Sequence, residues 1–221
     1  MTRTANARVA GIAYLLYIAA AGSGAYIFSR AVFGNDVATQ LASMAQHATQ
    51  VRLSELLGMI GSFCALALAV SLYSITRVQD GDIALVGFAF RLAEGIMGAV
   101  GVPVTLALVS VTALAGDAAP TADGLHAVAA VLLRRSSLIG AWLFAIGSTA
   151  FCWLLLRGRM IPAWLAWVGV AGSALLIVTL PLQVLRFIGS PFTAIAWVPI
   201  AFFEVVVAVW FLVKGVASFP A

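Results

Sequence analysis

Charged residues are scarce in this sequence, because Asp, Glu, Lys and Arg together make up 9% of its 221 residues. Hydrophobic residues make up 63%, which is well above the 45–50% or so that is usual in soluble domains. A soluble protein of this composition would expose large apolar patches and aggregate. The composition therefore excludes an ordinary soluble domain. It predicts an all-α polytopic membrane protein, which we expect to form a single integral-membrane helical domain over residues 1–221.

Motifs for binding metals and nucleotides are missing as well. The chain has only two cysteines, Cys64 and Cys152, and two histidines, His47 and His126. Both cysteines lie in apolar segments, where a thiol behaves as a small hydrophobic group. The sequence has no CxxC, HExxH or GxxxxGK[ST] pattern and no basic run. We therefore expect the protein to bind no metal, cofactor, nucleotide or nucleic acid. We expect its main contacts to be with the lipid bilayer.

Long apolar segments predict six membrane spans, since about 20 apolar residues cross the ~30 Å of hydrocarbon. The predicted spans are residues 8–28, 51–75, 83–115, 136–156, 162–180 and 194–213. The third is longer than one crossing requires, so it has to tilt or bend, and Pro103 is the expected kink. Arg134 and Arg135 interrupt the apolar run that leads into the fourth span.

Polar segments predict the connections between the spans. Residues 36–50 read as a surface helix with Asp36 as its N-cap. Residues 77–82, 116–124 and 181–191 read as loops, because they gather Gly, Pro, Asp and Gln.

An even number of spans places both termini on one side, and Lys and Arg usually mark the cytoplasmic side. Of the twelve Lys and Arg residues, six lie on the side of the termini, five lie on the other side, and Arg91 lies inside a span. The six are Arg3, Arg8, Arg77, Arg157, Arg159 and Lys214, and the five are Arg30, Arg52, Arg134, Arg135 and Arg186. This difference favours cytoplasmic termini.

A short charged phrase occurs twice, as Arg-Leu-Ser-Glu at residues 52–55 and as Arg-Leu-Ala-Glu at residues 91–94. Arg and Glu three residues apart share one face of a helix and can pair. Glycines follow each copy and allow either close helix packing or space for a ligand. Charges in a span are costly, so they predict a functional site. Local ion pairs with ordinary packing are the alternative reading.

A third acid, Glu204, lies ten residues before Lys214, or about 15 Å along a helix and near the middle of the last span. Trp197 and Phe211 lie seven residues to either side of Glu204 and so share its face. A protonated acid between aromatic rings suits protonation of an alkene and shielding of the resulting carbocation. Aromatic residues at this spacing also fit plain packing or lipid contact.

Two stretches carry a family resemblance: Ala-Arg-Val-Ala-Gly-Ile-Ala-Tyr-Leu at residues 7–15 and Glu-Val-Val-Val-Ala-Val-Trp-Phe-Leu-Val-Lys-Gly at residues 204–215. They resemble the opening and closing helices of a large bacterial family of integral-membrane proteins of unknown function. The resemblance implies about six helices in a bacterial plasma membrane and no established activity. In its layout of acids, with Glu55 early and Glu204 late, the chain also resembles small membrane-bound terpene (meroterpenoid) cyclases.

These observations together favour an intramembrane enzyme that uses buried carboxylates for acid catalysis on a lipophilic small molecule. The most concrete form is protonation-initiated cyclisation of a prenyl group. The alternatives are a proton- or cation-coupled carrier and a non-catalytic structural or signalling membrane protein. The predicted catalytic residues are Glu204, Glu55 and Glu94, and the predicted substrate-binding residues are Arg91, Trp197, Phe211 and Arg52.

Overall fold

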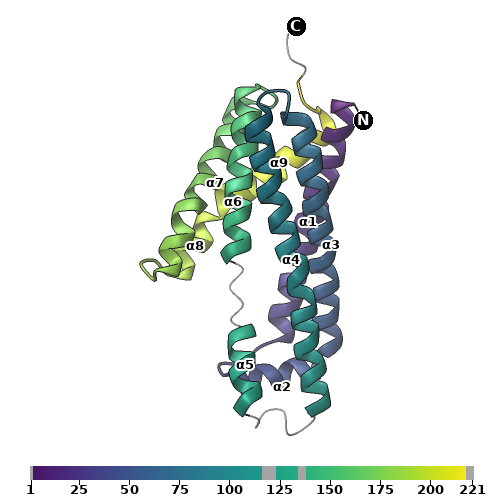
Figure 1. Ribbon diagram of the computed structural model, residues 1–221, viewed down its shortest axis with the longest axis vertical. Coiled ribbons are helices and arrows are strands. Elements are labelled where there is room, and N and C mark those ends of the chain that lie inside the picture. The colour runs from purple at the N-terminus through teal and green to yellow at the C-terminus, as the bar shows by residue number, and fades with distance from the viewer. Residues whose placement is uncertain (1, 116–122, 134–137, 218–221) are drawn as a thin grey trace. The chain divides into compact units, whose positions relative to one another are not determined.

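The computed structural model describes residues 2–115, 123–133 and 138–217 (Figure 1). Within these ranges the chain forms nine α-helices and no strand. They are α1 Arg3–Ala31, α2 Val37–Gln46, α3 Ala48–Thr76, α4 Gly81–Ala115, α5 Asp123–Leu133, α6 Leu138–Arg157, α7 Ala163–Val184, α8 Ser190–Ala196 and α9 Val198–Val213.

Six of the described helical segments are long and apolar enough to cross a membrane. They are Arg3–Ala31, Ala48–Thr76, Gly81–Thr112, Leu138–Arg157, Ala163–Val184 and Pro191–Val213. The all-helical fold with six candidate spans confirms the predicted fold class and is consistent with an integral membrane protein. Arg134 and Arg135 lie outside the described residues. Residues 116–122 of the loop predicted at 116–124 also lie outside them, and residues 123 and 124 begin α5.

The short helix α2 confirms the helix expected within residues 36–50. Asp36 is its N-cap, and the carboxylate accepts a hydrogen bond of 2.8 Å from the backbone N–H of Thr39. Leu41 and Met44 form the buried side of α2. Figure 1 shows α2 lying across the direction of α3, as expected for a helix on a membrane surface.

One predicted boundary is wrong, because α7 continues through Pro181 to Val184 instead of ending at residue 180. Proline has no backbone N–H, so the carbonyl of Ile177, four residues earlier, loses its helical donor. The indole N–H of Trp142 on α6 donates to that carbonyl instead, at 3.2 Å. A side chain from another helix thus satisfies the freed group, which is how spans tolerate proline. Pro103 likewise lies inside the continuous helix α4.

The described chain packs as two compact units. The first unit comprises residues 1–17, 63–95 and 137–221, and the second comprises residues 18–62 and 96–136. The boundaries fall within α1, α3 and α4. The single domain expected over residues 1–221 stays a prediction.

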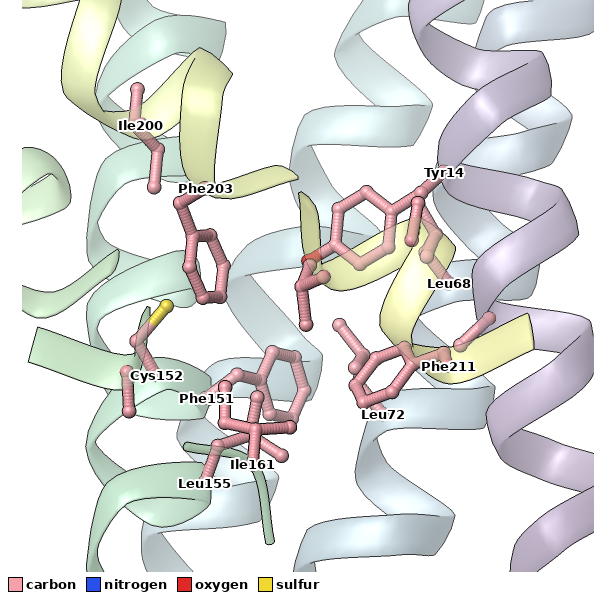
Figure 2. Close-up of a cluster of buried hydrophobic side chains, with 14 of the residues drawn as sticks. Tyr14, Leu68, Leu72, Phe151, Cys152, Leu155, Ile161, Ile200, Phe203 and Phe211 are labelled. Atoms are coloured by element: carbon pink, nitrogen blue, oxygen red, sulfur yellow. The ribbon is translucent and has the colours of Figure 1, made fainter. Parts of the chain in front are cut away.

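The core of the first unit is built on aromatic and aliphatic side chains from α1, α3, α6, α7 and α9 (Figure 2). Gly169 of α7 lets this helix pack closely on its neighbours, since a Cβ there would lie 2.7 Å from Cys152 Sγ and 2.8 Å from the Phe203 ring. Cys152 is a free, buried thiol in this cluster. It packs as the small hydrophobic group that the sequence predicts.

The second unit has its own core of apolar side chains. Gly98 of α4 packs on α3, because a Cβ there would lie 2.6 Å from Ser62 Oγ. Close packing is therefore observed at Gly98, whereas a Cβ at Gly58 would meet nothing within 4 Å. The buried members of the core are Ala31, Leu41, Met44, Val51, Leu108, Val109 and Ala129.

Candidate functional site

Arg91 of α4 is the largest fully buried side chain of the described protein, with 0% of its surface exposed. Its aliphatic stem crosses Gly147 of α6, where an added Cβ would lie 2.8 Å from Arg91 Cγ. The same Cβ would lie 3.1 Å from the carbonyl oxygen of Gly87. Glycine at position 147 therefore lets α6 pass close to α4 and leaves space for the arginine.

Glu94, one turn further along α4, provides the counter-charge to Arg91. Its Oε2 lies 2.8 Å from Nη1 of Arg91, and the contact is a bent ion pair rather than an aligned hydrogen bond. The hydroxyl of Tyr17 on α1 donates to Glu94 Oε1 at 2.9 Å. Only 9% of Glu94 is exposed. The expectation that Arg91 pairs with an acid is confirmed, and both oxygens of that acid are engaged.

Two aromatic rings flank the guanidinium. The Arg91 Cζ atom lies 4.8 Å from the ring centre of Phe144 on α6 and 5.7 Å from that of Tyr17. Nε and Nη2 of Arg91 have no hydrogen-bond partner among the described residues. Ring faces carry negative charge, and cation–π contacts reach about 2 kcal/mol when water is excluded. The rings therefore take over part of the role that hydrogen-bond acceptors would have.

Glu204 of α9 is buried, with 6% exposed, but it is not paired in this way. Its Oε1 atom is completely buried and has no hydrogen-bond partner in the described part of the chain. The charges of Arg91 and Glu94 lie close enough to interact with Glu204. The first unit thus holds two buried acids, of which one is engaged by a cation and a hydroxyl and the other is not.

The buried face of α9 carries Glu204 and Phe211, as their seven-residue spacing predicts. Phe211 is fully buried in the core (Figure 2). Trp197 is half-buried and lies at the junction between α8 and α9, with its ring centre 5.4 Å from that of Phe144. The substrate-binding roles of Arg91, Trp197 and Phe211 stay predictions.

The other copy of the charged phrase, Arg52 and Glu55, belongs to the second unit. Glu55 is buried, with 8% exposed, whereas Arg52 is exposed and forms no ion pair within the described chain. The ion pair that their spacing allows is therefore not formed in this copy. Arg52 is exposed near the start of α3, and a long side chain in such a place can keep its guanidinium in polar surroundings without a carboxylate. The side chains of both residues line a pocket between α3 and α4.

Tyr17, Phe144 and Gly147 complete the surroundings of Arg91 and were not singled out from the sequence. Tyr17 could have been recognised from the sequence, because a buried phenol in an apolar span needs a hydrogen-bond partner. Nothing in the sequence distinguishes Phe144 and Gly147, because Phe and Gly are ordinary residues of a membrane span. Among the described residues, no group of three His, Cys, Asp or Glu could hold a metal ion.

The fold and the buried charges define a polytopic helical protein of the membrane type. Residues 9–215 match the family described as a domain of unknown function (DUF4386), and the chain belongs to this family. The match agrees with the resemblance of the two chain ends to a membrane family of unknown function. No curated protein and no solved structure matches the chain. The likeness to terpene cyclases finds no support in these comparisons.

Proposed function

We propose that the protein is an intramembrane enzyme in which Glu204 donates a proton to a lipophilic substrate. The observation that carries the proposal is the buried carboxyl group of Glu204, whose Oε1 has no hydrogen-bond partner among the described residues. An ionised carboxylate in such surroundings is costly unless it is paired. The nearby cation, Arg91, is already paired with Glu94. In this proposal Glu204 is a neutral acid that holds its proton in the protein interior.

A concrete reaction is the cyclisation of a prenyl chain. The Glu204 proton adds to one carbon of an alkene, so that a C–H bond forms, the π bond breaks and the other carbon becomes cationic. A second alkene attacks that carbon: its π bond breaks, a new C–C bond closes a ring, and its other carbon becomes cationic. A carbon next to this second cation then loses a proton to the Glu204 carboxylate, and the C–H electron pair forms a new alkene. The product is an isomer of the substrate, so no oxidant, reductant or cofactor is needed.

The paired charges of Arg91 and Glu94 make this chemistry compatible with a nearby arginine. A lone guanidinium would repel a carbocation, but Glu94 at 2.8 Å compensates most of that charge. The ring of Trp197 packs at a tilt against Phe144, whose own ring lies next to Arg91. In this proposal Arg91 and Glu94 position the site. The direct catalytic role of Glu94 and the role of Glu55 as a second acid stay predictions.

The test is product formation by purified protein in lipid nanodiscs supplied with a farnesyl-substituted phenol. The parent should convert it to an isomer of equal mass that chromatography resolves. Glu204→Gln keeps size and hydrogen-bonding capacity but has no acidic proton, so it should form no product. Glu204→Asp should keep part of the activity. Asp82→Asn, which changes an exposed acid at the start of α4, is the matched control and should be fully active.

The carrier hypothesis uses the same carboxyl groups and is separated by a second assay on the same proteins. If neither the parent nor Glu204→Gln forms product, while the substitution abolishes pH-driven cation uptake into liposomes, Glu204 serves transport. Full activity of Glu204→Gln in both assays would leave Glu204 as a structural acid and remove the proposal.

We further propose that the chain resides in a bacterial plasma membrane with both termini in the cytoplasm. Six candidate spans support a common side for the termini, and the excess of Lys and Arg on that side supports the cytoplasm. Alkaline phosphatase fused after the C-terminus should be inactive, and the same enzyme inserted at Gly34 should be active. The reverse pattern would invert the orientation.

A further inference from the structure

The second unit contains a pocket of about 400 Å³ between α3 and α4. Pockets of roughly 300–1,000 Å³ hold small molecules. The residues that α3 contributes lie at positions 52, 55, 56 and 59, and those of α4 at 102, 106 and 110, which are spacings of a single helix face. Each helix therefore presents one stripe to the pocket. The pocket is a groove that runs along the two helices.

The register of the two helices shows which residues are level with each other. α3 and α4 are consecutive, and Ser62 of α3 touches Gly98 of α4. Counting in opposite directions from this contact places Arg52, ten residues before Ser62, level with residue 108. Met59, three residues before Ser62, comes level with residue 101. One end of the groove is thus formed by Arg52 and Ser110, and the other by Met59 and Val102.

The Arg52 end is polar and open. Arg52 and Ser110 are both exposed, and Arg52 forms no ion pair within the described chain. The Ser110 hydroxyl donates to the carbonyl of Leu106 at 2.9 Å, which leaves its lone pairs free to accept. A guanidinium offers a planar fork of donors that fits a carboxylate or phosphate group. Glu55 lines the same wall one turn deeper, and Arg52 is the basic residue of the pocket lining, so we place an anionic group at the Arg52 end.

The other end is apolar. Leu56, Met59, Val102 and Leu106 form its walls. Met59 lies seven residues from Arg52, or about 10 Å along the helix axis. A methionine adapts its shape to irregular hydrocarbon partners. The groove therefore changes from charged to apolar along its length.

The helix α2 marks which end of the groove faces the membrane surface. Its buried residues Leu41 and Met44 pack in one cluster with Val51 of α3 and Leu108 of α4. Val51 precedes Arg52, and residue 108 is level with it, so α2 lies at the polar end. A short amphipathic helix with a capped start is typical of the boundary between water and hydrocarbon. The polar end is therefore at headgroup depth, and the apolar end points toward the hydrocarbon.

We propose that this groove binds an amphiphile with an anionic headgroup, a phosphate monoester or a carboxylate, on a hydrocarbon chain. Arg52 holds the headgroup, and the first part of the chain lies between Met59 and Val102. The assignment rests on two matches: the positive charge of Arg52 fits an anionic headgroup, and the apolar end of the groove fits a hydrocarbon chain. It does not depend on the acid chemistry proposed for Glu204.

The experiment is a titration of the purified protein, in micelles of a neutral detergent, with hexadecyl phosphate and with hexadecanol. Native mass spectrometry counts the bound molecules. The two probes share a chain and differ in headgroup charge. We expect the phosphate to bind at least tenfold more tightly, which corresponds to about 1.4 kcal/mol. Arg52→Gln should bring the two affinities to parity.

Arg30→Gln is the matched control, because it removes an exposed arginine from the last turn of α1, on the same predicted side of the membrane as Arg52. It should keep the tenfold preference. Met59→Trp fills the apolar end and should weaken binding of both probes without changing their ratio. Glu204→Gln should bind like the parent, so a failure here is distinct from a failure of the proposed enzyme. Circular dichroism confirms that each variant keeps its helix content.

The source of the amphiphile is distinguished by competition. Displacement of hexadecyl phosphate by dioleoyl phosphatidic acid, but not by dioleoyl phosphatidylcholine, identifies a bilayer lipid. Displacement by neither identifies a single-chain molecule. The proposal is overturned if Arg52→Gln keeps the preference for phosphate, or if Arg30→Gln loses it to the same extent. It is also overturned if Met59→Trp leaves the binding of both probes unchanged.

Discussion

Arg91 and Arg52 occupy the same place in the same four-residue phrase, yet their surroundings differ in almost every respect. Arg91 is completely buried, lies 2.8 Å from Glu94 and stacks on Phe144. Arg52 is exposed, and no ion pair joins it to Glu55. Arg91 follows ten residues of helix α4, whereas Arg52 follows only four residues of α3. Depth in the helix, and not the local motif, decides whether the arginine has to find partners within the protein.

The largest expected difference between the copies is in stability. Arg91→Leu leaves the Glu94 carboxylate buried without its cation, and breaking a buried pair in this way costs about 3–5 kcal/mol. Arg52→Leu removes an exposed side chain that forms no ion pair within the described ranges, and it should stay within about 0.5 kcal/mol of the parent. Unfolding in mixed micelles with increasing sodium dodecyl sulfate, followed by circular dichroism, measures both. Equal losses for the two variants would show that the copies do not differ energetically.

A double substitution sharpens this comparison. Arg91→Leu combined with Glu94→Gln removes both charges and keeps an oxygen that can accept the hydrogen bond of Tyr17. It should recover about 2–3 kcal/mol of the loss caused by Arg91→Leu alone, because no buried charge is left unpaired. The matching cycle of Arg52→Leu and Glu55→Gln should show additivity within about 0.5 kcal/mol. The same unfolding titration gives the coupling energies, and a coupling near zero at Arg91 would contradict the ion pair.

The next effect concerns the glycine beneath Arg91. Gly147→Ala places a methyl group 2.8 Å from Arg91 Cγ, and overpacking of this kind costs about 1–3 kcal/mol. Gly140→Ala on the same helix is the control, because a Cβ there meets nothing within 4 Å. It should be neutral or stabilise slightly. Gly58, which follows Arg52 and Glu55, also has open space and should tolerate alanine equally. Thermal unfolding monitored by tryptophan fluorescence compares the three variants.

The smallest effect expected is at Tyr17. Tyr17→Phe removes the 2.9 Å hydrogen bond to Glu94 while keeping the ring near Arg91. Hydrogen bonds to charged groups contribute about 1.5–3 kcal/mol, and we expect the lower end because Tyr17 is half-buried. Tyr26→Phe, at an exposed tyrosine of the same helix, should have no measurable effect. If both variants unfold at the same detergent concentration as the parent, Tyr17 does not stabilise the ion pair.

The span pattern was predictable because the bilayer imposes a simple rule on hydropathy and length. From this rule and the polar segments we predicted six spans and the surface helix capped by Asp36. The predicted end of the fifth span was wrong, because Pro181 was expected to terminate the helix. The group that satisfies the freed carbonyl of Ile177 is the indole of Trp142, which is 35 residues away in the sequence. Local sequence carries no record of such a partner.

What the sequence by itself determined follows from helical periodicity. Residues three or four apart share a face, so the Arg91–Glu94 pair was readable, and the seven-residue spacing put Phe211 on the same face as Glu204. The tertiary structure decided which charged phrase is paired, because Tyr17, Phe144 and Gly147 come from α1 and α6 and meet Arg91 only after packing. It also left Glu204 without a hydrogen-bond partner among the described residues. The physical reason is that backbone geometry repeats along a helix, whereas the neighbours of a helix face are set by other segments of the chain.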